Sequence, residues 1–255
     1  MKLDNSIAAV VTGAASGLGA AVAVNLAEHG VRVAVLDMDE ERGAAQAAAI
    51  DGLYVRCDVG DSKSVASALK IAREALGQEQ ICVNCAGIAA AETTVYKGLP
   101  HDPDLFAKIV RVNLIGTFNM ASQSAAGMTA TDRLAADGER GVIVNTASIA
   151  AFDGQIGHIA YSASKAGVAG MTLPMARDLA RVGIRVLTIA PGIFETPMAT
   201  QLLDDAQQAA LAQVPFPSRF GKPVEFAALV THCVENTMLN GETIRIDGAY
   251  RMPPK

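Results

Sequence analysis

Tyr161 and Lys165 are the residues whose types and spacing point most directly to chemistry. They open a predicted helix over 160–181, and a separation of four residues places the phenol and the ammonium on one face of that helix. Tyrosine has a pKa near 10, so its use as a base near pH 7 requires a pKa lower by about 3 units, or roughly 4 kcal/mol. A lysine cation about 4 Å away, at an effective dielectric of about 20, supplies about that much. The pair is therefore suited to removing a proton from an alcohol.

Ser148 and Asn113 are candidates to assist this pair. Ser148 follows a predicted strand over 141–147, so we expect its hydroxyl at the same sheet edge, where it can hydrogen-bond a substrate oxygen. Asn113 lies among apolar neighbours inside a predicted helix and needs a polar partner, such as water held by Lys165. Alone, Ser148 is explained as a turn residue, Asn113 as a core polar group and Tyr161 as an amphipathic helix position. Their convergence on one edge favours a catalytic group of four.

A glycine-rich turn follows the first predicted strand. Its glycines are spaced G-x-x-x-G-x-G, and a helix is predicted to start at once. Small residues let the backbone approach a pyrophosphate, and a helix N-terminus presents free N–H groups to it. A tight turn without a ligand is the alternative, but the position after the first strand favours a dinucleotide. The predicted contacts in this turn are Gly13, Ser16, Gly17, Leu18 and Gly19.

Asp37 ends the second predicted strand, about twenty residues beyond the glycines. There its carboxylate can accept hydrogen bonds from ribose hydroxyls and repel a 2′-phosphate, so NAD is predicted as the cofactor rather than NADP. A helix-capping role is the alternative, which Asp39 can equally fill, and Arg42 leaves some room for NADP. Further cofactor contacts are predicted at the ends of the next two strands, at Asp58, Val59, Asn84, Ala86 and Gly87.

Alternating strands and helices must position these residues. Ala-rich segments of helical spacing separate short β-rich runs at 7–12, 31–36, 53–57, 81–85, 141–147, 183–190 and 242–246. This alternation predicts an α/β fold with a doubly wound parallel sheet of about seven strands and helices on both faces. No linker or repeat is visible, so one domain is predicted over 1–255, with a proline-rich lid at about 191–223.

Composition argues against several classes of partner. The net charge of −5 and the absence of a Lys/Arg run disfavour nucleic acid and anionic membranes. No stretch is long and apolar enough to span a bilayer, and no signal-peptide core precedes the first strand. We therefore expect a cytoplasmic protein, or one of the mitochondrial matrix if the source is a eukaryote. Cys82 and Cys85 spell C-x-x-C within a predicted strand, where they face opposite sides of the sheet, so no metal or redox site is predicted.

Together these motifs resemble the short-chain dehydrogenase/reductase family. The resemblance covers almost the whole chain and rests on the glycine turn, the Asn84-x-Ala86-Gly87 motif, the four catalytic candidates and Pro191-Gly192. It implies a Rossmann-type fold, a Ser148-Tyr161-Lys165-Asn113 tetrad and a homotetramer built largely through the helices predicted over 105–126 and 160–181. The further cofactor contacts assigned on this basis are Tyr161, Lys165, Pro191, Gly192, Ile193 and Thr196.

The expected activity is reversible oxidation of a secondary alcohol to a ketone by NAD. Stretches such as 214–219 and 247–249 resemble family members with hydrophobic acyl or steroid substrates, so we expect a short or branched 3-hydroxyacyl-CoA, and also hydroxysteroids. The predicted substrate contacts are Ser148, Gln155, Tyr161 and Phe194, while Arg219 and Lys222 are candidates for the CoA phosphates. The alternatives are an NADPH-dependent reductase of 3-oxoacyl thioesters and, from another class, a non-catalytic NAD-binding scaffold or sensor.

Overall fold

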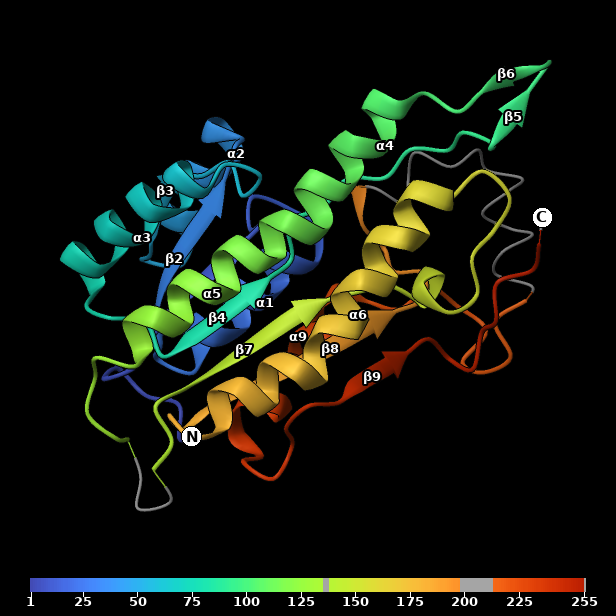
Figure 1. Cartoon of the computed structure of the whole chain (residues 1–255). Helices are drawn as coiled ribbons and strands as arrows, with labels where there is room; N and C mark the ends of the chain where they lie inside the picture. Colours follow the sequence, from blue (N-terminus) through green and yellow to red (C-terminus); the bar gives the residue numbers. More distant parts are fainter. Residues whose placement is uncertain (135–137, 198–212, 255) are drawn as a thin grey trace.

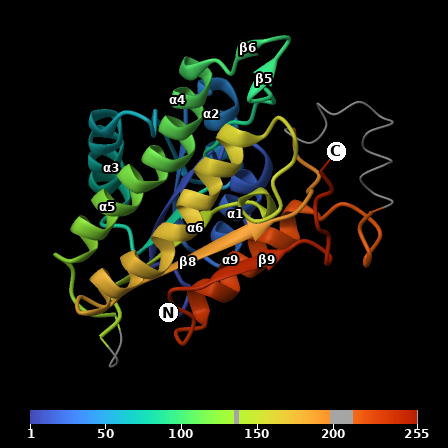
Figure 2. The same cartoon turned by 45° about the vertical axis from the view of Figure 1, so that its right-hand side comes forward.

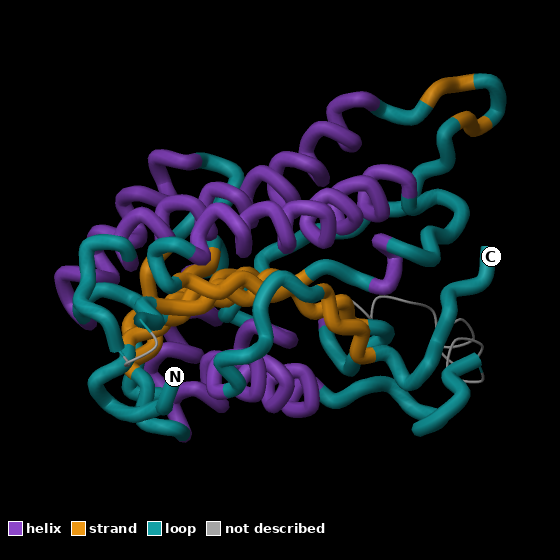
Figure 3. The backbone as a smooth tube through the Cα atoms, turned by 60° about the horizontal axis from the view of Figure 1, so that its bottom comes forward, coloured by secondary structure: helices purple, strands orange, loops and turns teal. Residues whose placement is uncertain are grey.

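A seven-stranded, fully parallel sheet forms the centre of the protein, and helices cover both of its faces (Figures 1 and 3). The computed structural model describes residues 1–134, 138–197 and 213–254. Across the sheet the strand order is β3-β2-β1-β4-β7-β8-β9. The strands are β1 (Ala8–Thr12), β2 (Arg32–Asp37), β3 (Leu53–Arg56), β4 (Ile81–Asn84), β7 (Gly141–Thr146), β8 (Ile184–Pro191) and β9 (Thr243–Ile246).

Two apolar clusters hold the helices against the sheet, one on each face. The first contains α1 (Gly17–Glu28), α2 (Glu40–Ala49) and α9 (Pro223–Glu235). The second contains α3 (Ser62–Leu76), α5 (Gly116–Met128) and α6 (Ile159–Ala180). Buried Val, Ile, Leu and Ala side chains from both faces of the strands fill these clusters, as expected for a covered parallel sheet. The arrangement confirms the predicted α/β, doubly wound fold.

The direction of strand addition reverses at the centre of the sheet. β1 pairs with β2 on one side and with β4 on the other, so the connections leaving these strands diverge. In open α/β sheets this switch point opens a crevice at the carboxyl ends of the strands. The residues that follow β1 and β4 therefore lie where ligands bind in such folds.

One long helical segment extends beyond this carboxyl edge. It begins with α4 (Pro103–Val110), continues through a π-helical turn, η1 (Arg111–Ile115), and runs on into α5. Before α4, strands β5 (Val95–Tyr96) and β6 (Leu99–Pro100) form an antiparallel hairpin that projects away from the sheet (Figures 1 and 2). A short 3-10 helix, η2 (Ile149–Ala151), follows β7 at the same edge. These pieces surround the carboxyl ends of the central strands.

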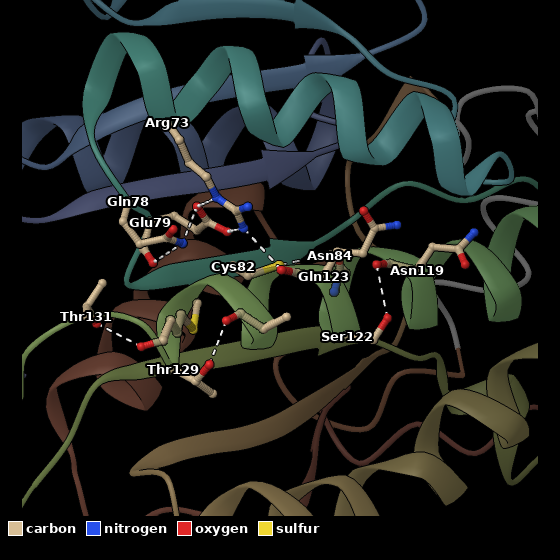
Figure 4. Close-up of polar contacts among 12 residues, drawn as sticks. Arg73, Gln78, Glu79, Cys82, Asn84, Asn119, Ser122, Gln123, Thr129 and Thr131 are labelled. Atoms are coloured by element: carbon tan, nitrogen blue, oxygen red, sulfur yellow. Dashed lines mark hydrogen bonds and ion pairs between the residues drawn. The ribbon is translucent and has the colours of Figure 1, made fainter.

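An ion pair fixes the opposite end of β4. Arg73, near the end of α3, donates to both carboxylate oxygens of Glu79 at 2.9 and 2.7 Å, and its Nη2 also donates to the carbonyl oxygen of Gln123 on α5 at 3.1 Å (Figure 4). Glu79 is buried, so the paired guanidinium is needed to compensate its charge. The contact ties α3, β4 and α5 together at the end remote from the crevice.

Candidate active site

The crevice contains a cavity of about 550 Å³ that runs along the carboxyl ends of β1, β2, β3 and β4. This volume lies within the range of about 300–1,000 Å³ that is usual for small-molecule and cofactor sites. Eleven residues predicted to contact the cofactor line it: Gly13, Ser16, Gly17, Leu18, Gly19, Asp37, Asp58, Val59, Ala86, Gly87 and Thr196. The structure therefore gathers most of the predicted set on one surface.

The glycine-rich turn requires glycine for two reasons. Gly13 adopts φ +64°, a left-handed conformation, and a Cβ at this position would lie 2.7 Å from the backbone nitrogen of Ala86. Gly17, the first residue of α1, also has a positive φ of +58°. The turn therefore packs backbone against the loop that follows β4 and leaves the N-terminal turn of α1 open to the cavity. Unpaired N–H groups at such a helix end attract a pyrophosphate.

Asp37 is hydrogen-bonded to the glycine-rich turn. Its Oδ2 accepts from the backbone N–H of Ala15 at 3.0 Å, and its Oδ1 accepts from the N–H of Asp39 at 3.0 Å. Asp39 caps α2 and forms an ion pair with Arg42 at 2.7 Å. The capping role therefore belongs to Asp39, and Arg42 already has an acidic partner. Asp37 presents its carboxylate at the cavity wall beside α1.

Asp58 and Val59 line the cavity after β3. The Oδ1 of Asp58 accepts from the backbone N–H of Gly60 at 2.9 Å, so this carboxylate also closes a local turn. Val59 is buried, and its carbonyl oxygen accepts from the side chain of Asn119 on α5 at 2.9 Å. Both residues thus combine the predicted location with a structural role.

The side chain of Asn84 lies in the core behind the cavity. It is 2% exposed and donates through Nδ2 to the side chain of Asn145 on the neighbouring strand at 2.9 Å. It points to the α5-covered face of the sheet, next to Cys82 (Figure 4), and does not line the cavity. The predicted cofactor contact at Asn84 therefore does not involve this side chain, and a contact through its backbone stays a prediction.

Lys165 lies against the cavity wall through Gly87. A Cβ built on Gly87 would lie 3.6 Å from the Nζ of Lys165 and 3.3 Å from the Oδ1 of Asn113. The same Nζ donates to the backbone carbonyl of Thr146 at 2.7 Å and lies 5.9 Å from the centroid of the Tyr161 ring. Gly87, Lys165 and Asn113 are therefore one contiguous group at the end of the cavity nearest α6.

Lys165 is buried and Tyr161 is half-buried, and loss of solvation is the largest influence on the pKa of each group. Burial raises the pKa of Tyr161, and the hydrogen bond between its phenol and Ser148 opposes part of that rise. Burial lowers the pKa of Lys165 to about 8. We predicted that Lys165 does most of the lowering of the Tyr161 pKa. In the structure this pKa is raised instead, because loss of solvation disfavours the charged form of each group.

Ser148 lies close to the Tyr161 phenol and comes from the loop after β7. It precedes η2, and its Oγ accepts from the N–H of Ala150 at 3.1 Å, so its hydroxyl is held in place by a short turn. Ser148 lies close enough to the Tyr161 phenol to lower its pKa, so the fold brings together two hydroxyls that are thirteen residues apart in the sequence. A single substrate oxygen can be reached from both hydroxyls.

Asn113 lies in the π-helical turn η1 and is fully buried. Its Oδ1 accepts from the N–H of Ile88 at 2.8 Å, while its Nδ2 donates to the carbonyl of Ile88 at 2.9 Å and to Ser164 Oγ at 3.0 Å. The side chain thus fixes the loop after Gly87 to α6. Single π-helical turns of this kind frequently mark functional sites.

Of the cofactor contacts predicted after β8, some reach the cavity and others do not. Pro191 ends β8, and Gly192 donates to Ile246 of β9 at 2.9 Å, while Thr196 reaches the cavity. Ile193 packs in a small apolar cluster at this edge. Residues 198–212, a little under half of the predicted lid, lie outside the described residues.

Phe194, a predicted substrate contact, lies mainly in the core. It is 5% exposed and packs edge-to-face on Phe226 of α9, with 6.3 Å between ring centroids. Its ring also occupies the space beside Gly221, where a Cβ would lie 2.6 Å away. Phe194 also lines a small hollow of about 110 Å³ together with Ile193 and Val214, and its contact with the substrate stays a prediction.

Gln155 lines a second hollow, of about 480 Å³, between the loop over 154–159 and residues 93–95 before the hairpin. The N–H of Glu92 donates to the carbonyl of Gly157 at 2.8 Å and joins the two walls. His158 stands at the start of α6, with its ring centroid 6.3 Å from that of Tyr161, and burial lowers its pKa. This hollow therefore lies next to the first turn of the helix that carries Tyr161.

Arg219 differs from its predicted role toward CoA phosphates. It forms two hydrogen bonds to Glu225, at 2.6 and 2.8 Å, and both side chains are about 40% exposed. The guanidinium charge is thus already compensated, and the same pairing lowers the pKa of Glu225 to about 2. We withdraw Arg219 as a phosphate contact.

Sequence reasoning missed several residues of the cavity wall. Lys108, Arg111 and Val112 reach it from the helical segment that carries Asn113, and Leu36, Met38, Cys57 and Cys85 reach it from strand ends. For the residues at strand ends, their position near the end of a predicted strand was a usable signal of a place in the cavity wall. For Lys108 and Arg111 the signal was weaker, because exposed cations on a helix are usually only solvated.

Other ligand types find little support in the described part of the chain. No group of His, Cys, Asp or Glu side chains there is arranged to hold a metal ion, and the four cysteines are free thiols. Burial raises the pKa of Cys82 to about 12 and that of Cys85 to about 11, so both thiols stay protonated at neutral pH. Among the described helices none is long and apolar enough to span a bilayer.

Comparison with known proteins supports the site as a whole. A sequence profile of the family described as short chain dehydrogenase matches residues 7–207. The 3-hydroxyacyl-CoA dehydrogenase type-2 proteins of Bos taurus and Homo sapiens are 49% and 48% identical to this chain over 252 residues, which is 97% of this chain and 96% of each relative. The crystal structure of 3-hydroxyacyl-CoA dehydrogenase type-2 from Mycobacterium avium matches with a TM-score of 0.94 at 40% identity, covering 98% of both chains. All three similarities include the cavity and the residues around Tyr161.

Proposed function

The chain belongs to the short-chain dehydrogenase/reductase family, and from that premise we propose that it uses NAD to oxidise the 3-hydroxyl group of short or branched acyl-CoA thioesters, and to reduce the ketones in the reverse direction. Membership in the family makes the chain an oxidoreductase that acts on a small molecule. The observation that carries the proposal is the contact of Gly87 with both Lys165 and Asn113. It connects the cofactor-sized cavity directly to the proton-transferring groups.

The residues present fit a nicotinamide dinucleotide. A Cβ at Gly13 would fill the space beside Ala86, so this glycine preserves a cradle at the N-terminus of α1 for a pyrophosphate. Asp37 supports NAD over NADP, because a carboxylate accepts hydrogen bonds from ribose hydroxyls and repels a 2′-phosphate. When bound, the oxidised nicotinamide accepts a hydride, and its positive charge favours the phenolate form of a nearby tyrosine.

The four polar side chains have separable roles. Tyr161 takes the proton of the substrate hydroxyl, and Ser148, which shares a hydrogen bond with it, polarises the same oxygen. Lys165, held by the carbonyl of Thr146, supplies a cation close to the phenol and a donor for a ribose hydroxyl. Asn113 holds the loop after Gly87 in place and provides polar groups next to Lys165 for a water relay.

The substrate assignment rests on the relatives and on the apolar surroundings of the site. The names of the relatives specify 3-hydroxyacyl-CoA. Ile193 and Val214 line a hollow of about 110 Å³ and pack with Ile149, the residue after Ser148. An aliphatic acyl chain suits such a surface better than a sugar does. A homotetramer is part of the proposal, supported by the apolar groove between α5 and α6, in which Phe118 is 50% exposed.

Turnover assays test this proposal. The purified protein is incubated with NAD⁺ or NADP⁺ and a panel of 3-hydroxyacyl-CoA thioesters, hydroxysteroids, sugars and simple alcohols, and reduced cofactor is measured by absorbance. We expect the highest kcat/KM for a short or branched 3-hydroxyacyl-CoA with NAD⁺. Better turnover of free acids, sugars or small polar alcohols would remove the thioester assignment and leave the dehydrogenase activity. Absence of turnover with every pair, together with NADH binding, would instead favour an NAD-binding scaffold.

A further inference from the structure

Arg245 on β9 contacts the segment that carries Ser148, although it lies outside the catalytic group. It belongs to the edge strand of the sheet and is paired with Ala190 of β8. Its side chain is 22% exposed. Its Nη2 donates to Asp153 Oδ2 at 2.5 Å, and its Nε donates to Asp247 Oδ2 at 2.7 Å. One guanidinium therefore binds two carboxylates from two different parts of the chain.

The first carboxylate, Asp153, ends the short turn that begins with Ser148. The N–H of Asp153 donates to the carbonyl of Ile149 at 2.9 Å, and Ser148 Oγ accepts from Ala150 at 3.1 Å at the other end of the turn. The turn is compact and closed by its own hydrogen bonds. A fixed Asp153 therefore restricts the positions of two residues. One is Ser148, at the start of the turn, and the other is Gln155, two residues after Asp153.

The same guanidinium also holds the C-terminal tail. Its Nη2 donates to the carbonyl oxygen of Tyr250 at 3.1 Å. Tyr250 is 3% exposed and packs in one cluster with Ile149 of η2, and the N–H of Ile156 donates to the carbonyl of Pro254 at 3.1 Å. The tail thus lies along residues 149–156, with Arg245 between the tail, the turn and β9.

The electrostatics of this cluster make Arg245 hard to replace. The planar guanidinium reaches Asp153 and Asp247 in different directions and lies 5.4 Å from the ring centroid of Phe152, an arrangement that the single ammonium of lysine cannot reproduce. Without it, two partly buried carboxylates lose the cation they share. Arg251 also pairs with Asp247, at 3.0 Å, but it is 58% exposed and does not contact Asp153.

We propose that Arg245 is a positioning residue for the reaction: by binding Asp153 it fixes the turn over residues 148–155 against β9, and so sets where the Ser148 hydroxyl and the Gln155 amide meet the substrate. For the identity of the substrate this inference rests on the function proposed above. The glycine turn, Asp37 and Gly87 are not part of the cluster, and of the predicted cofactor contacts Gly192 packs against Asp247, so we expect Arg245 to have only a small effect on cofactor affinity.

Three variants test the proposal: Arg245→Gln, Arg245→Lys and, as a matched control, Arg251→Gln, which removes the other arginine on Asp247. For each we measure kcat and KM with an acyl-CoA substrate, expressed per NADH-binding site so that misfolded protein does not count. For Arg245→Gln we expect a higher KM and a fall in kcat/KM of about tenfold or more, since small misplacements of reacting groups carry large costs. Arg245→Lys should recover part of this loss, and NADH affinity should stay within about twofold of wild type in all three.

A double variant tests whether the effect runs through Asp153. In Arg245→Gln/Asp153→Asn the uncompensated carboxylate is gone, so we expect kcat/KM at or above that of Arg245→Gln alone. If the losses of kcat/KM from the two substitutions multiply in the double variant, the proposal is overturned. So would equal kinetic constants per site for Arg245→Gln and Arg251→Gln. Should wild type prefer another alcohol, the proposed function fails, and the same comparison made with that alcohol still decides the role of Arg245.

Discussion

The Nζ of Lys165 donates a 2.7 Å hydrogen bond to the carbonyl oxygen of Thr146, two residues before Ser148. This bond joins the first turns of α6 to the carboxyl end of β7, the two elements that carry Tyr161 and Ser148. The Lys165 ammonium is therefore held by a backbone carbonyl and not by Tyr161, the residue that it assists. Its burial has a measurable consequence for stability as well as for catalysis.

Replacing Lys165 by Met should reveal a pH-dependent stability difference. The folded protein has a Lys165 pKa of about 8, against 10.5 for the free group, so between these pH values the unfolded chain binds a proton that the folded protein releases. The free energy of unfolding of the wild type, minus that of the variant, should therefore rise with pH across this window by up to about 3 kcal/mol. Below the window it should stay constant. Urea unfolding of both proteins at several pH values measures this, with the exposed Lys63→Met as control. A difference that is flat or falls with pH would contradict the assigned burial effect.

Tyr161→Phe should separate catalysis from cofactor binding. The ring and its packing remain, while the proton-transferring hydroxyl and its hydrogen bond to Ser148 are lost. We expect NADH affinity within about twofold of wild type and kcat lower by about 10²- to 10⁴-fold. Tyr96→Phe, in the exposed hairpin, should leave both unchanged. Wild-type turnover in Tyr161→Phe would remove this residue from the mechanism.

Asp37→Ser should change cofactor preference. It removes a carboxylate from the cavity wall, weakening NAD and relieving repulsion of a 2′-phosphate, so the ratio of kcat/KM for NAD to that for NADP should fall by about tenfold or more. Asp61→Ser, which alters the cap of α3 away from the cavity, should not change that ratio. Steady-state kinetics with both cofactors measure it, and a wild-type preference for NADP would already refute the argument.

Gly87→Ala should lower activity through crowding. The added methyl group would lie 3.3 Å from Asn113 Oδ1, which is tight enough to displace this side chain slightly, and in ordinary contact with Lys165 Nζ at 3.6 Å. We expect kcat to fall several-fold, and further in Gly87→Val. Gly170→Ala, where the added Cβ meets nothing within 4 Å, should keep full activity and gain up to about 1 kcal/mol of helix stability. Unchanged kcat in Gly87→Val would show that the close approach at Gly87 does not matter.

Chain-length dependence should report the apolar substrate site. Each buried methylene contributes up to about 0.8 kcal/mol, so kcat/KM should increase by up to about fourfold per carbon over the first few carbons and then level off. We also expect acetoacetyl-CoA and 2-methyl-3-hydroxybutyryl-CoA to outperform the corresponding free acids. Steady-state kinetics over a homologous series measure both effects. A series with no dependence on length would contradict an apolar acyl site next to Ile193 and Val214.

The sequence predicted the sheet well because each central strand is a short, almost continuous apolar run that ends in a turn signal. β7 and β8, for example, are buried along their whole lengths. Helix α2 was expected only as one of the Ala-rich segments between strands, since its mixture of Gly, Glu and Ala carries little apolar periodicity and gives no precise bounds. Its N-terminal signal was visible, because Asp39 caps it.

The side-chain surroundings that the sequence did not predict depend on contacts between distant segments. Asn84 donates to Asn145, sixty-one residues away, and no pattern within one strand shows such a partner. Phe194 follows Ile193 in a loop, and its sequence surroundings do not distinguish a core contact with Phe226 from a substrate contact. No sequence pattern around Arg245 indicated its role, because that role depends on its contacts with Asp153 and Asp247 in the fold.

The strand order also has a kinetic consequence. Apart from Thr196 and Pro197, the cavity wall is made by residues 13–112, whose strands β1, β2, β3 and β4 pair with one another. Ser148, Tyr161 and Lys165 arrive later in the chain and depend on β7 joining the exposed edge of β4 across about sixty residues. Because closing long loops slows folding, we expect the nucleotide half to gain structure first during synthesis, and the proton-transferring half to be completed on it as a template.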